Sequence, residues 1–207
     1  MDYITVANET QIETVMQKSR FIGWCIAVSG EAEATRRLEE RRKQYRDATH
    51  NCYAYVTGDK GQITRSSDDG EPSGTAGIPI LEAIKHKGLT DTLVVVTRYF
   101  GGILLGAGGL VRAYSGAASQ ALDSAGRLHY TQTEEYSIET GYPEWNRLEN
   151  GLKNLPCKID QVEFTGSVRA TILVRKQDSP ALRSQISDWT DGKVTPILTG
   201  ESSRAWS

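Results

Sequence analysis

Cysteine is scarce in this sequence, and no apolar run approaches the length needed to cross a membrane. The three cysteines, Cys25, Cys52 and Cys157, are far apart and form no Cys-x-x-Cys pair, so the sequence predicts neither a disulfide framework nor a zinc site. The first residues lack a basic segment followed by an apolar one, so we expect no signal peptide. Together these absences predict a cytoplasmic protein without membrane contact.

Charge of one sign is also lacking. The 207 residues carry 24 basic and 26 acidic side chains, which gives a net charge of −2. The balance holds in both halves, with 14 basic and 15 acidic residues up to Gly126 and 10 and 11 after it. A module that binds nucleic acid through its overall charge is therefore excluded, and any contact with RNA has to use a local patch.

Strand and helix patterns alternate through the first 126 residues. Runs of β-branched and aromatic residues predict strands, and the clearest, TLVVVTRYF, is continuously apolar up to Arg98. Apolar residues at helical spacing and clusters of small residues predict helices that pack on a sheet. The predicted strands are 20–28, 50–58, 63–67 and 92–100, and the predicted helices are 30–45, 75–88 and 110–126. We expect an α+β protein whose N-terminal domain, residues 1–126, is of βαβ type.

A second domain is predicted at residues 134–207. The composition turns polar at 127–133 (RLHYTQT), which predicts a linker. The patterns that follow predict a strand at 134–142, a helix at 143–155, strands at 158–166 and 167–176, a helix at 179–192 and a strand at 193–200. This βαββαβ order within about 70 residues is that of the ferredoxin-like fold.

The segment RSSDDGEPSGTAG, residues 65–77, concentrates carboxylates and glycines in one loop. Asp68, Asp69 and Glu71 are hard oxygen ligands that suit magnesium or calcium, but adjacent aspartates point in different directions, the EF-hand spacing is absent, and we predict no metal. The alternative is a tight bend at Asp69 and Gly70, in which Asp68 accepts hydrogen bonds from backbone N–H groups.

His50 and Cys52 lie two residues apart on a predicted strand, so both side chains point to the same face. A catalytic dyad would need electropositive surroundings to ionise the thiol, and a strand cysteine is more often a small core residue. We therefore predict no catalytic residue, and we expect His50 to hydrogen-bond with the acidic loop.

The glycine-rich segment GGILLGAGG, residues 101–109, separates a predicted strand from a predicted helix. It lacks the spacing of a phosphate-binding P-loop, but amides at a helix start bind anions, and Arg98 and Arg112 flank it. The glycines also permit a close helix–strand crossing, and both roles are compatible. The candidate anion-binding loop consists of Gly101, Gly102, Gly106, Gly108 and Gly109.

Four segments of the sequence resemble a known family. DATHNCYAY, RSSDDGEPSGTAG, LVVVTRYFGG and LGAGGLVRAY occur in the order and spacing of the IMPACT/YigZ family. The resemblance covers roughly residues 18–126, and the remainder is similar to the C-terminal domain of bacterial YigZ-type members. Ile78 stands where many relatives carry lysine, so the resemblance gives this position no ligand role.

The resemblance implies two folds and a cellular process. It implies an N-terminal domain similar to a small-subunit ribosomal protein domain and to GHMP-type kinases. It also implies a ferredoxin-like C-terminal domain similar to the last domain of elongation factor G. Eukaryotic relatives regulate translation by competing for a protein partner in an amino-acid-starvation pathway. Kinase activity is disfavoured, because neither serine, threonine nor lysine accompanies Gly106, Gly108 and Gly109.

We therefore predict a non-catalytic binding protein linked to translation, which needs no cofactor and contacts a ribosome-associated protein or RNA. The alternative is an enzyme acting on a phosphorylated small molecule or nucleotide at the arginine and glycine-loop pocket. We expect Asp68 and Asp69 to hold Arg98 through charge-assisted hydrogen bonds. The predicted binding face consists of His50, Asn51, Asp68, Asp69, Gly70, Glu71, Arg98, Tyr99 and Arg112.

Overall fold

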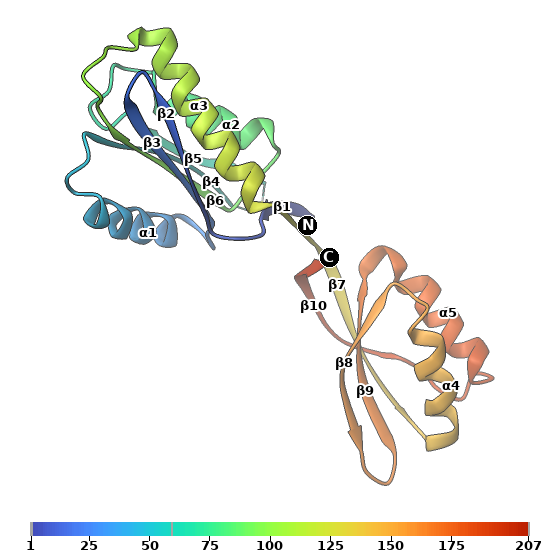
Figure 1. Cartoon of the computed structure of the whole chain (residues 1–207). Coiled ribbons are helices and arrows are strands. Elements are labelled where there is room, and N and C mark those ends of the chain that lie inside the picture. The colour runs from blue at the N-terminus through green and yellow to red at the C-terminus, as the bar shows by residue number, and fades with distance from the viewer. Residues whose placement is uncertain (1, 59, 207) are drawn as a thin grey trace. The chain divides into compact units, whose positions relative to one another are not determined.

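The computed structural model describes residues 2–58 and 60–206, which divide into two compact units. One unit comprises residues 3–129 and the other residues 130–206 together with Asp2. Each contains helices and a β-sheet of its own (Figure 1). The predicted two-domain α+β class is therefore confirmed.

The N-terminal unit is built on a five-stranded sheet in the order β2-β3-β6-β4-β5, with antiparallel neighbours. Its central strand β6 carries the continuously apolar sequence found above and is buried along most of its length. The strands are β2 (Thr10–Met16), β3 (Ser19–Ala27), β4 (His50–Thr57), β5 (Ile63–Ser67) and β6 (Thr92–Tyr99).

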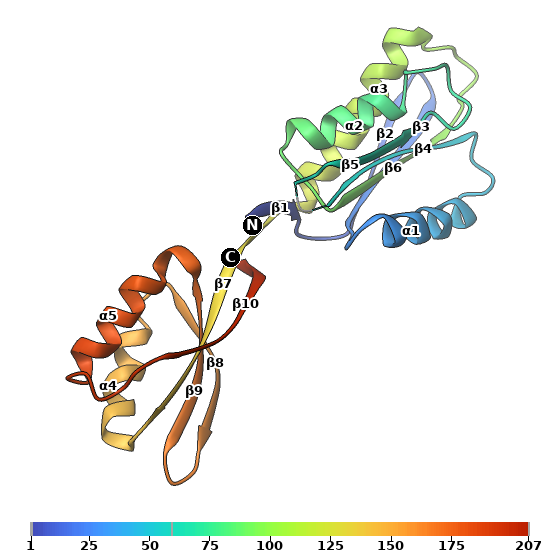
Figure 2. The ribbon, with the colours of Figure 1, turned by 180° about the vertical axis from the view of Figure 1, so that it is seen from behind.

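Helices cover both faces of this sheet. Helix α1 (Glu31–Gln44) lies on one face, and α2 (Gly77–His86) and α3 (Gly106–Ala125) lie on the other (Figures 1 and 2). Because side chains alternate along a strand, Cys52 and Ala54 of β4 enter the core below α2 and α3, whereas Tyr55 packs with α1.

Three features of the N-terminal unit differ from the sequence prediction. Strands β1 (Tyr3–Val6) and β2 were not predicted; β2 is an edge strand with polar residues at two of its three exposed positions, and only every second residue packs on the core. Helix α3 begins at Gly106 rather than at residue 110, so its first turn includes glycines that resemble a loop in sequence.

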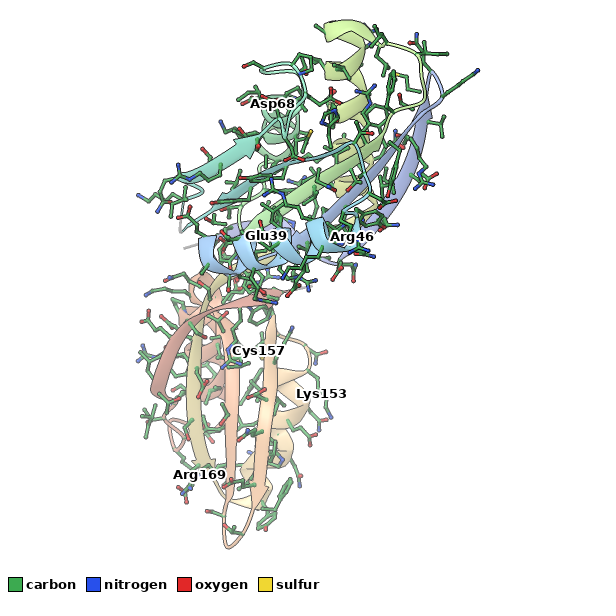
Figure 3. The ribbon with its side chains drawn as sticks, turned by 90° about the vertical axis from the view of Figure 1, so that its left-hand side faces the viewer. Glu39, Arg46, Asp68, Lys153, Cys157 and Arg169 are labelled. Atoms are coloured by element: carbon green, nitrogen blue, oxygen red, sulfur yellow. The ribbon has the colours of Figure 1, made fainter. Side chains whose placement is uncertain are left out.

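The C-terminal unit has the predicted βαββαβ order. Its strands pair in the order β10-β7-β9-β8, the ferredoxin-like arrangement, and β1 also pairs with β7. Cys157 and Arg169 mark the neighbouring strands β8 and β9 in Figure 3. The elements are β7 (Arg127–Thr140), α4 (Tyr142–Leu152), β8 (Cys157–Phe164), β9 (Val168–Arg175), the short 3-10 helix Lys176–Asp178, α5 (Ser179–Trp189) and β10 (Ile197–Trp206).

Two boundaries in this region are corrected. Residues 127–133, for which polar composition predicted a linker, are the first half of strand β7, and their backbone is extended in a sheet. The last strand runs over Ile197–Trp206 rather than 193–200, and Trp206 closes it by donating its indole N–H to the Thr133 hydroxyl over 2.8 Å. Polar residues in a strand that faces solvent on one side explain both errors.

Candidate functional site

The acidic loop begins with Asp68, which holds the start of α2 (Figure 3). One carboxylate oxygen of Asp68 accepts the N–H of Gly74 over 2.9 Å, and the other accepts those of Ala76 and Gly77 over 3.0 and 2.8 Å. Burial would raise the pKa of this carboxyl, but the three donors together outweigh burial and lower it. The prediction that Asp68 accepts hydrogen bonds from backbone N–H groups is therefore confirmed.

Asp69 fastens the same loop to β4. It adopts a positive φ of 45°, followed by 89° at Gly70, which makes the predicted bend. Its carboxylate accepts the N–H of Asn51 over 2.6 Å and contacts Arg42 over 3.3 Å. Its carbonyl lies 2.8 Å from Nδ1 of His50; since a carbonyl only accepts, Nδ1 carries the proton. The expected contact of His50 with the acidic loop is confirmed.

Glu71 turns inward to a buried polar cluster. Its Oε1 accepts hydrogen bonds from the Arg98 guanidinium over 2.6 Å and from the Tyr114 hydroxyl over 2.7 Å. His50 Nε2 lies 3.8 Å from the same oxygen. Burial, the nearby Cys52 and the bond to Glu71 raise the pKa of Tyr114, so this hydroxyl remains a donor.

The prediction that Asp68 and Asp69 hold Arg98 is wrong, because Glu71 does so. Both aspartates are committed to backbone N–H groups of α2 and β4, whereas Glu71 follows the bend and enters the core side of the loop. A second guanidinium nitrogen of Arg98 donates to Ser19 Oγ over 3.2 Å. The Nε of Arg98 is buried without a hydrogen-bond partner.

A cavity of about 380 Å³ opens beside this cluster. Its polar side is formed by His50, Glu71 and Arg98, which come from β4, the acidic loop and β6. Gly106 and Ala107, at the amino end of α3, also line the cavity. The remaining wall is mostly apolar, and the full lining is Thr49, His50, Glu71, Pro72, Arg98, Phe100, Leu104, Leu105, Gly106, Ala107 and Leu110. This arrangement suits a small ligand with one polar end.

The other predicted site residues are dispersed around the cavity. Asn51 accepts a hydrogen bond from Thr97 over 2.8 Å, and Tyr99 donates to Asp47 over 3.0 Å while Arg20 stacks on its ring. Arg112 is exposed and outside the cavity lining, because α3 begins at Gly106 and places it in the second turn rather than the first.

The predicted glycine loop divides into two parts. Gly101 packs against the backbone of Lys18 and Ser19, so a side chain at this position would overlap with the turn between β2 and β3. Gly106, with φ of 69°, starts α3 and lines the cavity, whereas Gly109 packs against Leu105. The close-packing role applies to Gly101, and only the helix start remains a candidate for binding an anion.

Nucleophilic chemistry at Cys52 has little support in this geometry. Its thiol donates to the Asp68 carbonyl over 2.9 Å, and burial is the main reason that its pKa rises to about 12. Among the residues that the structure describes, no group of three or more His, Cys, Asp or Glu side chains is arranged to hold a metal ion.

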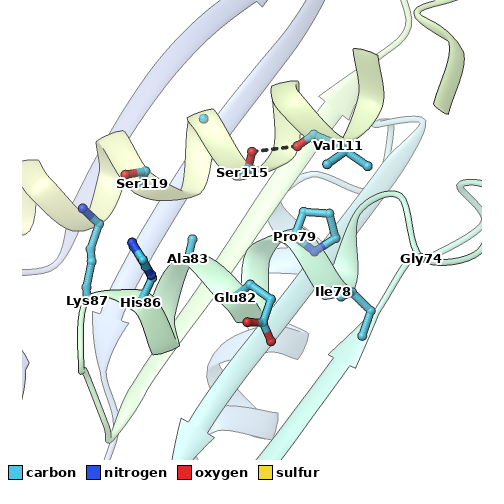
Figure 4. Close-up of a pocket in the computed structure, with 11 residues that line it drawn as sticks. Gly74, Ile78, Pro79, Glu82, Ala83, His86, Lys87, Val111, Ser115 and Ser119 are labelled. Carbon is cyan, nitrogen blue, oxygen red and sulfur yellow. Dashed lines mark hydrogen bonds between the residues drawn. The ribbon is translucent and has the colours of Figure 1, made fainter. Parts of the chain in front are cut away.

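A larger groove of about 620 Å³ lies between α2 and α3, away from the predicted residues. Figure 4 shows Pro79, Ala83 and His86 of α2 along one side and Ser115 and Ser119 of α3 along the other. It includes the exposed Ile78, and no buried charged side chain lines it. The smaller cavity, which is lined by the buried charged side chains of Glu71 and Arg98, is therefore the better candidate for a binding site.

Sequence reasoning missed several residues of the site. Tyr114 and Ser19 complete the partners of Glu71 and Arg98, but their helix and strand give no local signal of this role. Phe100 and Leu104 form the outer wall, and they do carry a signal, because large apolar residues lie between glycines in a loop.

Fold and site together define a two-domain α+β protein with a preorganised, ligand-sized cavity in its N-terminal unit. Residues 17–122 match the family described as Impact N-terminal domain, and residues 138–193 match a domain of unknown function, DUF1949. The chain therefore belongs to the IMPACT family.

Whole-length relatives support this assignment. The chain is 39% identical over 199 residues to IMPACT family member YvyE of Bacillus subtilis, covering 96% of this chain and 91% of that protein. It is 34% identical over 200 residues to IMPACT family member YigZ of Escherichia coli, covering 96% and 98%. A crystal structure of a hypothetical protein shares 32% identity and a TM-score of 0.62, covering 97% of this chain and 98% of that one.

Across residues 2–58 and 60–206, no helix is both long enough and apolar enough to cross a membrane.

Proposed function

We propose that this chain is a non-catalytic binding protein of translation or its regulation, acting in the cytoplasm by contacting a ribosome-associated protein. Family membership supports the process, since the resemblance noted above implies regulators of translation. The contact surface that we propose is the loop between β6 and α3 with the adjoining acidic-loop rim.

The observation that carries this proposal is the exposed apolar surface of that loop. Phe100, Ile103 and Leu104 are 46%, 41% and 85% exposed. Large apolar side chains that a protein exposes together mark interaction surfaces more often than scattered ones do. Leu104 in particular has little packing to lose and a large area to bury in a complex.

The loop presents these side chains from an ordered backbone. The N–H of Phe100 donates to Thr49 Oγ1 over 3.0 Å, and the N–H of Gly101 donates to Ser19 Oγ over 3.2 Å. The Arg98–Glu71 pair anchors the strand end from which the loop leaves. An interface that is ordered before binding loses less conformational entropy on association.

A protein partner is favoured over RNA by the distribution of charge. In the C-terminal sheet, two of the cations form ion pairs, Arg169 with Glu139 and Arg204 with Glu135, and Lys158 and Arg175 lie over the ring of Trp206. From residue 127 onward the chain has 10 basic and 11 acidic side chains. Such a surface supplies little of the phosphate neutralisation on which RNA affinity depends.

The alternative function, an enzyme that acts on a phosphorylated small molecule, has weaker support than the binding protein. The cavity contains one guanidinium, that of Arg98, and Glu71 already neutralises it. The thiol of Cys52 is buried and un-ionised, and Asp68 and Asp69 are committed to the backbone.

The test is cosedimentation of the tagged full-length protein with ribosomes from a cell lysate, at low and moderate salt. We expect wild type to cosediment, and Leu104→Ser to lose at least 90% of that binding without a change in folding. Val15→Ser is the control, because Val15 is 69% exposed on β2 and outside the loop. Wild type remaining soluble at both salts, or equal loss in both variants, would contradict the proposal.

A further inference from the structure

The cavity between the acidic loop and the start of α3 has the size and polarity of a small-molecule site. Its volume of about 380 Å³ lies near the lower end of the range for ligand pockets. The side chains of Phe100, Leu104 and Leu110 make most of the wall apolar, and the polar groups converge at one end. A ligand that fits must therefore combine a compact apolar body with one polar end.

The cavity wall also contains the start of α3, whose first backbone donors lack partners within the helix. The first N–H groups of an α-helix have no intrahelical acceptor, and no side chain caps the start of α3. Gly106 and Ala107 place this helix start in the cavity wall. The 20-residue helix adds the partial positive charge of its amino end, so the position favours an anion.

Arg98 supplies an independent indication of a ligand. Its side chain is only 6% exposed and lines the cavity, yet its Nε has no hydrogen-bond partner. The other two nitrogens donate to Glu71 and Ser19. A buried N–H without an acceptor is costly, and native structures rarely leave one unpaired. The two bonds to Glu71 and Ser19 use only two of the five guanidinium N–H groups, so Arg98 retains donors for a ligand at the cavity wall.

The charges around the cavity restrict the anion to a small one. Glu71 neutralises Arg98 and shares its Oε1 between Arg98 and Tyr114, and no other arginine or lysine lines the cavity. A polyphosphate would carry several negative charges into a site with little positive charge to balance them. A single carboxylate, with two oxygens for the guanidinium of Arg98 and the helix amides, matches the donors present.

From these observations we infer that the cavity binds a monocarboxylate whose body is a short branched or aromatic group. This goes beyond the proposed contact with a ribosome-associated protein, since it assigns a small-ligand site behind the loop rather than a surface on it. Two kinds of ligand carry such a carboxylate: a free organic acid and the C-terminal end of a polypeptide.

The test is calorimetric titration of the full-length protein with two acids, their two neutral amides, and AMP as a phosphorylated competitor. Isovalerate and its neutral isostere isovaleramide examine the free acid, and N-acetyl-leucine and N-acetyl-leucinamide examine a chain end. We expect at least one acid to bind tenfold or more tightly than its amide. Preference for isovalerate identifies a free acid, and preference for N-acetyl-leucine identifies a chain terminus. Equal affinity of acid and amide in both pairs, no binding of either acid, or tighter binding of AMP would overturn the inference.

Three variants locate the binding. Ala107→Trp fills the cavity from an exposed position and should abolish acid binding, whereas Gln120→Trp, exposed on the same helix outside the lining, should not change it. Ala107→Pro removes one amide from the first helical turn, where proline is tolerated, and should weaken acid binding about tenfold. If Ala107→Trp bound the acid as tightly as wild type, the proposed location of the binding site in this cavity would be refuted.

Discussion

Arg98 and Glu71 form an ion pair of 2.6 Å between strand β6 and the acidic loop, with side chains only 6% and 4% exposed. Residues 27 positions apart in sequence are thus joined inside the N-terminal unit. Attraction between the charges offsets their loss of hydration only while both partners are present. The pair therefore couples the position of the loop to the end of β6.

Glu71→Gln should destabilise the protein by about 3 kcal/mol, because it leaves the Arg98 guanidinium buried without a countercharge. The double variant Glu71→Gln/Arg98→Met should recover most of that loss, since it removes both charges. Urea unfolding of both variants and of Arg98→Met measures the coupling. Additive losses in the double variant would contradict a buried, mutually dependent pair.

Asp68→Asn should destabilise the protein by about 2 kcal/mol, because the amide places an N–H group where the carboxylate accepts one. Glu82→Gln, an exposed carboxylate on α2, should remain within about 0.5 kcal/mol of wild type. Urea midpoints at neutral pH compare the two variants, and equal midpoints would contradict the capping role.

The contribution of Asp68 should also depend on pH. Its pKa is lowered in the folded protein, so its stabilisation is fully present above the unfolded pKa of about 3.9 and is lost as the pH falls through the lower folded value. The difference in stability between wild type and Asp68→Asn should therefore narrow below about pH 4. A difference that stays constant down to pH 2 would show that the charge of Asp68 is irrelevant.

Much of the fold follows from local patterns in the sequence. The apolar strand β6 and the βαββαβ order of the second unit were predicted because burial on one or both faces leaves a clear periodicity. Strands β2 and the first half of β7 were missed because polar residues occupy much of their length. An edge strand forms because it pairs with a neighbouring strand, and the local pattern of residues does not reveal that pairing.

The site shows the same division between local and long-range information. The contact of His50 with the acidic loop and the acceptance of backbone N–H bonds by Asp68 were predicted from neighbouring residues and loop chemistry. The partner of Arg98 was not, because three carboxylates lie within four residues and the bend at Asp69 decides which one turns inward. Tyr114 reaches Glu71 across 43 positions, and only the fold brings them together.

The thiols should react slowly in the native protein. Burial is the main cause that raises the pKa of Cys25 and Cys52 to about 12, and it raises the pKa of Cys157 to about 11. At pH 8 a thiol of pKa about 12 is ionised to only ~10⁻⁴, and the thiolate is the reactive form. Ellman's reagent should therefore modify these thiols rapidly only in denaturant. Fast native modification of Cys52 would restore it as a candidate nucleophile.

Gly101 holds the proposed binding loop against the turn between β2 and β3. A Cβ at this position would overlap with the backbone of Lys18 and Ser19, which cannot rotate away as a flexible side chain would. We expect Gly101→Ala to lower the free energy of unfolding by about 1–3 kcal/mol. We also expect it to displace the exposed Phe100 and Leu104 from the positions that they occupy in this structure. The folded Gly101→Ala variant should therefore also cosediment less with ribosomes than wild type does.

Gly116→Ala is the matched control, because a Cβ there meets no atom within 4 Å and lies in the middle of α3. Alanine should stabilise that helix by about 0.5–1 kcal/mol through its lower conformational entropy in the unfolded chain. Urea midpoints should consequently move in opposite directions for the two glycines. A Gly101→Ala variant as stable as wild type would mean that the loop can leave the turn without cost, and the ordered surface proposed for binding would then lack its structural basis.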